Sequence, residues 1–465
     1  MLPPASRARR PATTPAREVA LAVLRAVTDR GAYANLLLPA LLAERGLHGR
    51  EAALATELAY GTLRGRGSYD AVLAACSTRP LTGIDPPLLD VLRLGTHQLL
   101  ATRIGPHAAV STSVALARNV AGAGAAGFAN AVLRRVAARD LDSWIAAVAP
   151  DRAVNPVGYV AVKTSHPGWV VAAISEALGE EPVTGLPVTE AALAANGMRP
   201  LVTLCAVPGL ANPADVAARG GRVARWSPFG VYLDGGDPAA IPEVREGRAA
   251  VQDEASQLAA LALTRAGTGG DRRWLDLCAG PGGKARLLAG LTAGSGARLL
   301  AGDVREHRAR LVRAAMAPAG AGAAIVADGT APAWRPGSFD RVLADVPCSG
   351  LGALRRRPDA RWRKTPADVA ALGGLQRSLL RTAIDAARPG GVIAYVTCSP
   401  HAAETRAVVG EVTAARRDVL VLDAPALLAE VPDLPCPAPD GRYAQFWPHL
   451  HGTDAIFLAL LRRLG

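Results

Sequence analysis

Residues 275–284, LDLCAGPGGK, join an apolar segment to a stretch rich in alanine and leucine. A glycine-rich loop between a first strand and the following helix lets the backbone approach a ligand closely. The loop is not a phosphate-binding P-loop, because Cys278 occupies a position that needs Gly and Ala285 one that needs Ser or Thr. Taken alone, the loop fits either a ligand site at the edge of a sheet or a tight structural turn.

Apolar segments alternate with helical stretches on both sides of this loop and beyond it. The segments expected to form strands are Arg273–Leu277, Ala297–Gly302, Ala323–Val326, Arg341–Ala344 and Val392–Val396. Such alternation predicts a parallel, doubly wound α/β sheet of the Rossmann-like kind. A hairpin of 443–447 with 455–461 is expected to complete it.

Aspartates stand at the ends of four of these strands. Asp303 ends the second strand, 20 residues after Gly283, where a doubly wound nucleotide site places an acceptor for the ribose hydroxyls. Asp276, Asp328 and Asp345 lie at or after the ends of the first, third and fourth strands. Any one of them is more often a cap or turn residue. Together they predict a nucleoside cofactor, and without a triphosphate loop S-adenosylmethionine is favoured.

Two loops at the same predicted edge contain cysteine. They are DVPCSG at 345–350 and YVTCSP at 395–400, and the strands before them are expected to be neighbours. A thiolate that adds to carbon 6 of cytosine makes carbon 5 able to attack a methyl group. The site must activate that thiol, since an ordinary cysteine has a pKa of about 8.5. Small buried cysteines or a disulfide remain alternatives, whereas the spacing does not favour a metal site.

The whole chain has 465 residues, a net charge of +12 and an isoelectric point of about 10.0. This excess of positive charge favours a polyanionic partner such as nucleic acid. We find no apolar run long enough to cross a membrane and too few cysteines for a disulfide framework, so we expect a cytoplasmic protein. The predicted divisions are a disordered basic tail at 1–16, a helical domain at 17–140, a small α+β connector at 141–250 and the sheet domain at 251–465.

Five motifs resemble those of the Sun-type RNA cytosine-C5 methyltransferases, and specifically of their RsmB branch, which acts on small-subunit ribosomal RNA. The motifs are CAGPGGK at 278–284, DVPCSGLG at 345–352, RRRPDARWR at 355–363, TCSP at 397–400 and VQDEAS at 251–256. The helical domain is similar to the RNA-binding NusB fold through residues 17–38 and the FANAVLR stretch at 128–134. The resemblance therefore implies a NusB-like domain, the connector and a methyltransferase domain.

The resemblance also implies roles for single residues. Cys398 would be the nucleophile, Cys348 would assist product release, and Asp345 would face the base. The residues implied to hold S-adenosylmethionine are Cys278, Ala279, Gly280, Pro281, Gly282, Gly283, Lys284, Asp303, Asp328 and Asp345.

The basic run after Cys348 predicts contacts with RNA, because arginine binds phosphate and tryptophan stacks on bases. Its members are Arg355, Arg356, Arg357, Arg361, Trp362, Arg363 and Lys364. A solvated charged face is the alternative. We expect a monomer that methylates a cytosine of 16S ribosomal RNA at carbon 5 and holds no metal. A tRNA substrate, or an assembly factor that binds RNA without catalysis, remains open.

Overall fold

The computed structural model describes residues 13–436 and 441–465. The chain forms two compact units, which we call the helical unit and the sheet unit. Of the described residues, the helical unit contains 13–172, 181–197 and 356–363, and the sheet unit contains 173–180, 198–355, 364–436 and 441–465. Most of the predicted basic tail, 1–12, lies outside the described residues, and a helix already begins at Pro15.

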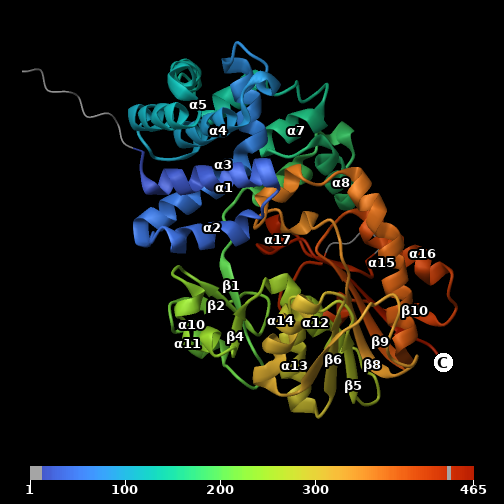
Figure 1. Ribbon diagram of the computed structural model, residues 1–465. Coiled ribbons are helices and arrows are strands. Elements are labelled where there is room, and N and C mark those ends of the chain that lie inside the picture. The colour runs from blue at the N-terminus through green and yellow to red at the C-terminus, as the bar shows by residue number, and fades with distance from the viewer. Residues whose placement is uncertain (1–12, 437–440) are drawn as a thin grey trace, which may run out of the picture. The chain divides into compact units, whose positions relative to one another are not determined.

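The helical unit is built from amphipathic helices, as the periodicity of 17–140 predicts (Figure 1). Val19, Val23 and Val27 recur at i+4 on the first helix and are buried against the others. Its helices are α1 Pro15–Arg30, α2 Ala34–Glu44, α3 Gly49–Cys76, α4 Pro86–Ala101, α5 Pro106–Val136, α6 Leu141–Val148, α7 Pro156–Thr164 and α9 Pro187–Asn196. α8, Gly168–Leu178, is divided between the two units.

A small antiparallel sheet opens the main part of the sheet unit, with strand order β2-β3-β1-β4. Its strands are β1 Val202–Ala206, β2 Gly221–Val223, β3 Gly230–Leu233 and β4 Ala249–Val251, with helices α10 Pro213–Ala217 and α11 Pro242–Arg245. The segment 141–250, predicted as one connector, is thus divided. Its first helices pack on α3, whereas β1 packs on a helix of the sheet unit.

The large sheet has the order β10-β12-β9-β8-β5-β6-β7, with β11 paired to β12. The strands are β5 Arg273–Asp276, β6 Arg298–Asp303, β7 Gly322–Val326, β8 Phe339–Asp345, β9 Ala387–Thr397, β10 Val419–Val421, β11 Ala444–Gln445 and β12 Phe457–Arg463. β5 to β9 pair in parallel and β12 runs antiparallel. The five predicted parallel strands and the pairing of the final hairpin are confirmed.

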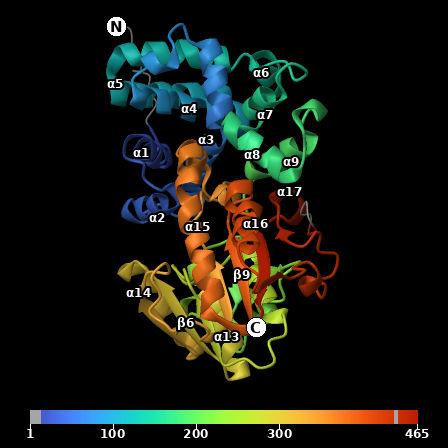
Figure 2. The same cartoon turned by 90° about the vertical axis from the view of Figure 1, so that its right-hand side faces the viewer.

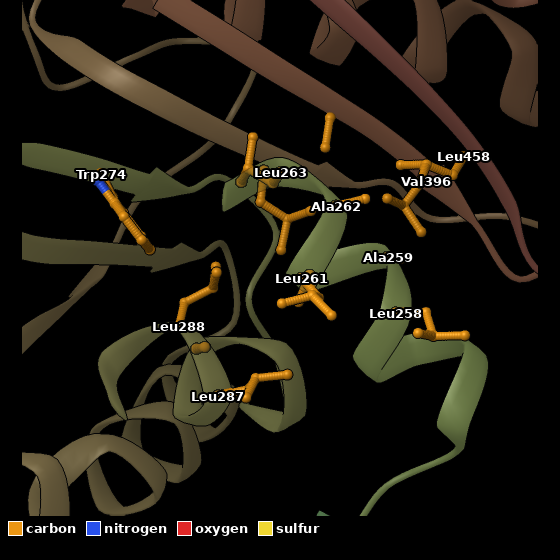
Figure 3. Packing of buried hydrophobic residues seen from close by; sticks show 14 of the residues in the cluster. Leu258, Ala259, Leu261, Ala262, Leu263, Trp274, Leu287, Leu288, Val396 and Leu458 are labelled. Atoms are coloured by element: carbon orange, nitrogen blue, oxygen red, sulfur yellow. The ribbon is translucent and has the colours of Figure 1, made fainter. Parts of the chain in front are cut away.

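Helices bury both faces of this sheet, which explains the nearly continuous apolar runs of its strands. The remaining helices of the sheet unit are α12 Glu254–Arg265, α13 Gly283–Ser295, α14 Glu306–Met316, α15 Pro366–Ala386, α16 Arg406–Ala414 and α17 Pro448–His451. One face packs on α12, α13 and α14, where Leu258 and Leu261 meet Leu288 (Figure 3). The other face packs on α15 and α16 (Figure 2). Among the described residues, no helix has the length and apolar character needed to cross a membrane.

Candidate active site

The site lies at the carboxyl edge of the large sheet, where the strand order changes direction at β5. The chain passes from β5 through β6 to β7 on one side and then returns to β8 on the other side of β5, and sheets of this kind bind ligands at such a point. The loop 277–283 follows β5 at this point. Its backbone N–H at Gly280 donates to Asp303 Oδ2 over 3.1 Å, and a Cβ at Gly280 would overlap that carboxylate. Gly282 has φ +110°, which also requires glycine.

Asp276 is a buried acid at the floor of this edge, only 1% exposed. Neither of its carboxylate oxygens accepts a hydrogen bond of ordinary geometry from the described residues. Burial, followed by the charge of Asp345, raises the pKa of Asp276 to about 8, and Lys284 and the backbone of Cys278 oppose the shift only in part. A carboxyl group in this state is poised to receive a cation, because a positive charge would stabilise its ionised form.

Lys284 joins the glycine-rich loop to the cysteine loops. Its Nζ donates to Asp345 Oδ2 over 2.8 Å. Burial opposes the charge on Lys284, yet the charge and hydrogen bond of Asp345 raise its pKa overall. The lysine expected to hold a cofactor is therefore a buried cation within the reaction site.

The aspartates at this edge differ in how well they suit a cationic nucleoside cofactor. Asp303 is buried and receives the backbone N–H groups of Gly280 and Arg305, so it fixes the loop and keeps lone pairs for a further donor. Asp328 is exposed, and its Oδ1 accepts from the N–H and hydroxyl of Thr330 in a local turn. S-adenosylmethionine carries a sulfonium and an ammonium group, which suit an edge with Asp276, Asp303 and Asp345. The role of Asp328 stays a prediction.

The two predicted cysteines lie together. Because β8 pairs with β9 in parallel register, their loops meet, and the Sγ atoms of Cys348 and Cys398 are 3.3 Å apart. A hydrogen bond from Cys348 lowers the pKa of Cys398, whereas burial and then the charge of Asp345 oppose this shift; the charge of Lys284 offsets that of Asp345 only in part. The same hydrogen bond, together with burial, raises the pKa of Cys348. The directions of the two shifts make Cys398 the more readily ionised thiol of the pair.

A buried carboxylate that the sequence analysis did not select holds the Cys348 loop on both sides. Glu404 accepts from the N–H of Ser349 over 2.7 Å and from its hydroxyl over 2.5 Å. Gln376 donates to Glu404 over 3.2 Å and to the carbonyl of Pro347 over 2.9 Å. The residues before and after Cys348 are thus fixed to α15 and to the segment after Cys398. The one sequence signal for Glu404 is that it follows Cys398 closely, in the stretch TCSPHAAE at 397–404. Gln376 lies in no motif that points to the site.

Two residues of the predicted RNA-contacting run are buried, and for them that prediction is wrong. Arg361 is 0% exposed and donates to three backbone carbonyls of the helical unit, those of Arg64, Ser165 and Asn196. Burial lowers its pKa to about 9. Arg355 is also buried and lies 3.8 Å from Asp253 in the sheet unit. Both side chains serve the fold.

The rest of the run is exposed to differing degrees. Trp362 is half-buried, packs on the Cα side of Gly67 and lies under the guanidinium of Arg66. Arg363 pairs with Asp359 at 3.0 Å. Arg357 is exposed, and Arg356 and Lys364 are half-buried. Contact with RNA stays a prediction for these three and for Trp362 and Arg363.

Family models match two separate parts of the chain. Residues 264–462 match the family described as 16S rRNA methyltransferase RsmB/F, and residues 14–138 match the NusB family. The chain is 51% identical over 467 aligned residues to the putative methyltransferase Rv1407 of Mycobacterium tuberculosis, with 100% of both chains covered. It is 31% identical to the probable ribosomal RNA small subunit methyltransferase B of Bacillus subtilis, over 97% of this chain and 99% of that one.

Solved structures share the fold. The crystal structure of PH0851 superposes with a TM-score of 0.76 at 19% identity and covers 98% of this chain and 100% of its own. NSun6 from Pyrococcus horikoshii, solved with SFG, has a TM-score of 0.52 at 16% identity and covers 64% of this chain and 98% of its own. At these identities the likeness concerns architecture, and it confirms the predicted fold class.

Proposed function

Since the chain belongs to the RsmB/F family of 16S rRNA methyltransferases and is an S-adenosylmethionine-dependent RNA methyltransferase, we propose that it methylates carbon 5 of a cytosine in small-subunit (16S) ribosomal RNA. One observation carries the choice of carbon 5. The Sγ atoms of Cys398 and Cys348 lie 3.3 Å apart, and the hydrogen bond between them lowers the pKa of Cys398. Methylation at a nucleophilic nitrogen or oxygen needs no such pair, whereas carbon 5 of cytosine must first be activated.

Cys398 begins the reaction. Its thiolate adds to carbon 6, so that an S–C6 bond forms and the electron pair of the 5,6 double bond moves toward carbon 5. S-adenosylmethionine, when bound, would supply an electrophilic methyl group to carbon 5, and its S–CH3 bond would break to leave a neutral thioether. A base then removes the proton from carbon 5, the 5,6 double bond re-forms, and the S–C6 bond breaks to return Cys398 as thiolate. Cys348, which lies in contact with Cys398 Sγ, assists this release by donating a hydrogen bond to the departing thiolate.

Asp345 and Lys284 orient the base and stabilise charge. Asp345 lies at the end of β8, beside the cysteine loops, and can accept from the exocyclic amino group of cytosine. Its hydrogen bond to Lys284 fixes its rotamer. The loop 278–284 and Asp303 would hold the cofactor, with Asp276 beneath. Because the site is at a sheet edge, the target base must leave its stack to reach Cys398.

The proposal is tested with labelled S-adenosylmethionine, unmodified 16S rRNA and unmodified tRNA, followed by nucleoside mass spectrometry. We expect 5-methylcytosine in the 16S rRNA. Cys398→Ala should abolish it, and Cys348→Ala should accumulate a covalent protein–RNA adduct. Full methyl transfer by folded Cys398→Ala protein contradicts the mechanism. Label in tRNA alone keeps the chemistry and changes the substrate, and RNA binding without label in either RNA supports the assembly factor.

A further inference from the structure

Two serines follow the two cysteines of the site, and they lie together as the cysteines do. Ser349 comes directly after Cys348, and Ser399 comes directly after Cys398. The hydroxyl oxygens of the serines are 3.2 Å apart, and the Sγ atoms of the cysteines are 3.3 Å apart. Both serines are buried, whereas both cysteines are partly exposed. The two loops therefore meet at two successive positions, and the serine contact is the more deeply buried one.

Glu404 holds both loops at this contact. Its side chain accepts from the N–H of Ser349 over 2.7 Å and from the hydroxyl of Ser349 over 2.5 Å. Its backbone carbonyl accepts from the hydroxyl of Tyr395 over 2.8 Å, and Tyr395 lies on β9, three residues before Cys398. Glu404 thus binds the loop of Cys348 through its side chain and the strand that leads to Cys398 through its main chain.

Three donors converge on the carboxylate of Glu404, which are the N–H and hydroxyl of Ser349 and the amide of Gln376. The same amide donates to the carbonyl of Pro347, directly before Cys348. A carboxylate only accepts, so it satisfies all three donors, whereas an amide of the same shape would set its own N–H groups against one of them. Because Glu404 is 0% exposed, it offers no surface to RNA or cofactor. Its influence on the reaction must therefore pass through the loop of Cys348.

We propose that Glu404 is a positioning residue for product release, which holds Cys348 in hydrogen-bond contact with Cys398 Sγ while the S–C6 bond breaks. In that step the electron pair of the S–C6 bond passes to Cys398 Sγ, the proton of carbon 5 goes to the base, and Cys348 donates its hydrogen bond to the departing sulfur. The inference rests on the proposed function, because only the covalent route contains this step.

The contact between the two thiols explains why such a hold is needed. Cys348 can donate only while the two sulfurs stay close, and a displacement of about 1 Å can cost about 100-fold in rate. The hydrogen bond to Cys398 and burial raise the pKa of Cys348, and the charge of Glu404 adds to this shift. Glu404 therefore supports the donor in two ways, by fixing its loop and by keeping its proton in place.

The test uses the full-length chain, labelled S-adenosylmethionine and a 16S rRNA transcript, and it follows the first turnover and the steady state separately. Glu404→Ala should transfer a methyl group in the first turnover and then lower kcat about 10–100-fold, with a covalent protein–RNA adduct on denaturing gels. The ratio kcat/KM should change much less than kcat, because release comes after binding and methyl transfer. Glu404→Gln should change kcat and adduct level in the same direction by less, since it keeps part of the hydrogen bonding.

Asp340→Ala is the matched control for the loss of a buried carboxylate. Asp340 is 7% exposed, and it accepts from the N–H groups of Arg272 and Arg273 over 2.8 Å each. It lies at the start of β8, at the end of the strand opposite to the cysteine loops. Asp340→Ala should lower the free energy of unfolding, measured by denaturation, without accumulating adduct.

A double variant separates positioning through Cys348 from a general loss of structure. Added to Cys348→Ala, Glu404→Ala should slow release no further, because the donor is already absent. Additive effects of the two changes overturn the proposal, as do kcat and adduct levels in Glu404→Ala equal to those of Asp340→Ala. If Glu404→Ala does not fold, Ser349→Ala, which removes a single hydroxyl, should show the same accumulation of adduct on a smaller scale, and its absence overturns the proposal.

The unaltered protein separates this inference from the proposed function. If it methylates 16S rRNA through an adduct and the Glu404 variants release product at its rate, only the inference fails. If it forms neither adduct nor 5-methylcytosine, the proposed function fails and the inference fails with it.

Discussion

Arg361 in the helical unit and Asp276 in the sheet unit are both buried charged residues, but their surroundings differ. Arg361 donates to three carbonyls, and two of these belong to helix ends, Ser165 at the cap of α7 and Asn196 at the last residue of α9. Helix ends leave carbonyls without partners, so this guanidinium completes the fold. Asp276 receives no such set of donors. A buried charged side chain whose hydrogen-bond partners are present thus stabilises the fold, whereas one that lacks such partners is expected to bind a ligand.

The largest expected effect comes from removing the guanidinium of Arg361 and with it the hydrogen bonds to three backbone carbonyls. Arg361→Leu should lower the free energy of unfolding of the helical unit by about 3–5 kcal/mol, because three carbonyls lose a charged donor. Chemical denaturation followed by circular dichroism measures this. Arg361→Lys keeps the charge but cannot reach three carbonyls with one planar fork, so it should recover only part of the loss. Stability equal to that of the unaltered protein, together with lost RNA affinity, would return Arg361 to RNA binding and break the comparison.

The next effect comes from Asp276, and it should concern the ligand instead of the fold. Asp276→Asn should weaken S-adenosylmethionine binding about 10–100-fold, the loss expected for one charge-assisted contact. Its free energy of unfolding without cofactor should be unchanged or higher, since a buried carboxylate is removed. Isothermal titration calorimetry and denaturation give the two values. Asp328→Asn, at an exposed turn, is the control, and equal losses in both variants would contradict the distinction.

The pH dependence of stability sharpens the same contrast. The pKa of Asp276 is raised to about 8 in the folded chain, against about 3.9 for an unfolded aspartate. The folded state therefore holds a proton that the unfolded state releases, and stability from this group falls as pH rises from about 4 to about 8. Relative to Asp276→Asn, the unaltered protein should lose stability across that window and level off above it. A difference that is constant with pH would show that Asp276 is ionised throughout.

Local sequence patterns predicted the structural features that depend on residues close together in the chain. The five parallel strands follow from apolar runs, and the meeting of Cys348 with Cys398 follows from the pairing of β8 with β9. Burial of Arg361 could not be predicted, because its acceptors at Arg64, Ser165 and Asn196 come from three helices more than 160 residues earlier in the chain. A run of arginines in a sequence records composition, and only the fold decides which of them reach solvent.

The hydrogen bonds that Glu404 and Gln376 make with the Cys348 loop were not predicted, for the same reason. The two side chains come from different elements and meet only through the sheet, where Glu404 is fully buried. Likewise, the connector predicted at 141–250 could not be divided correctly, since composition does not tell which core a short helix will join.

The smallest expected effect concerns Arg357, four residues before Arg361 and exposed where Arg361 is buried. Arg357→Ala should change the free energy of unfolding by no more than about 0.5 kcal/mol, as for most surface positions. If Arg357 contacts phosphate, the same variant should reduce RNA affinity a few-fold and lower the salt slope by about 0.7. Denaturation and fluorescence titration on one preparation measure both quantities. A large loss of stability in Arg357→Ala would mean that exposure does not separate the two arginines, and the contrast between completed and solvent-facing charges within this segment would fail.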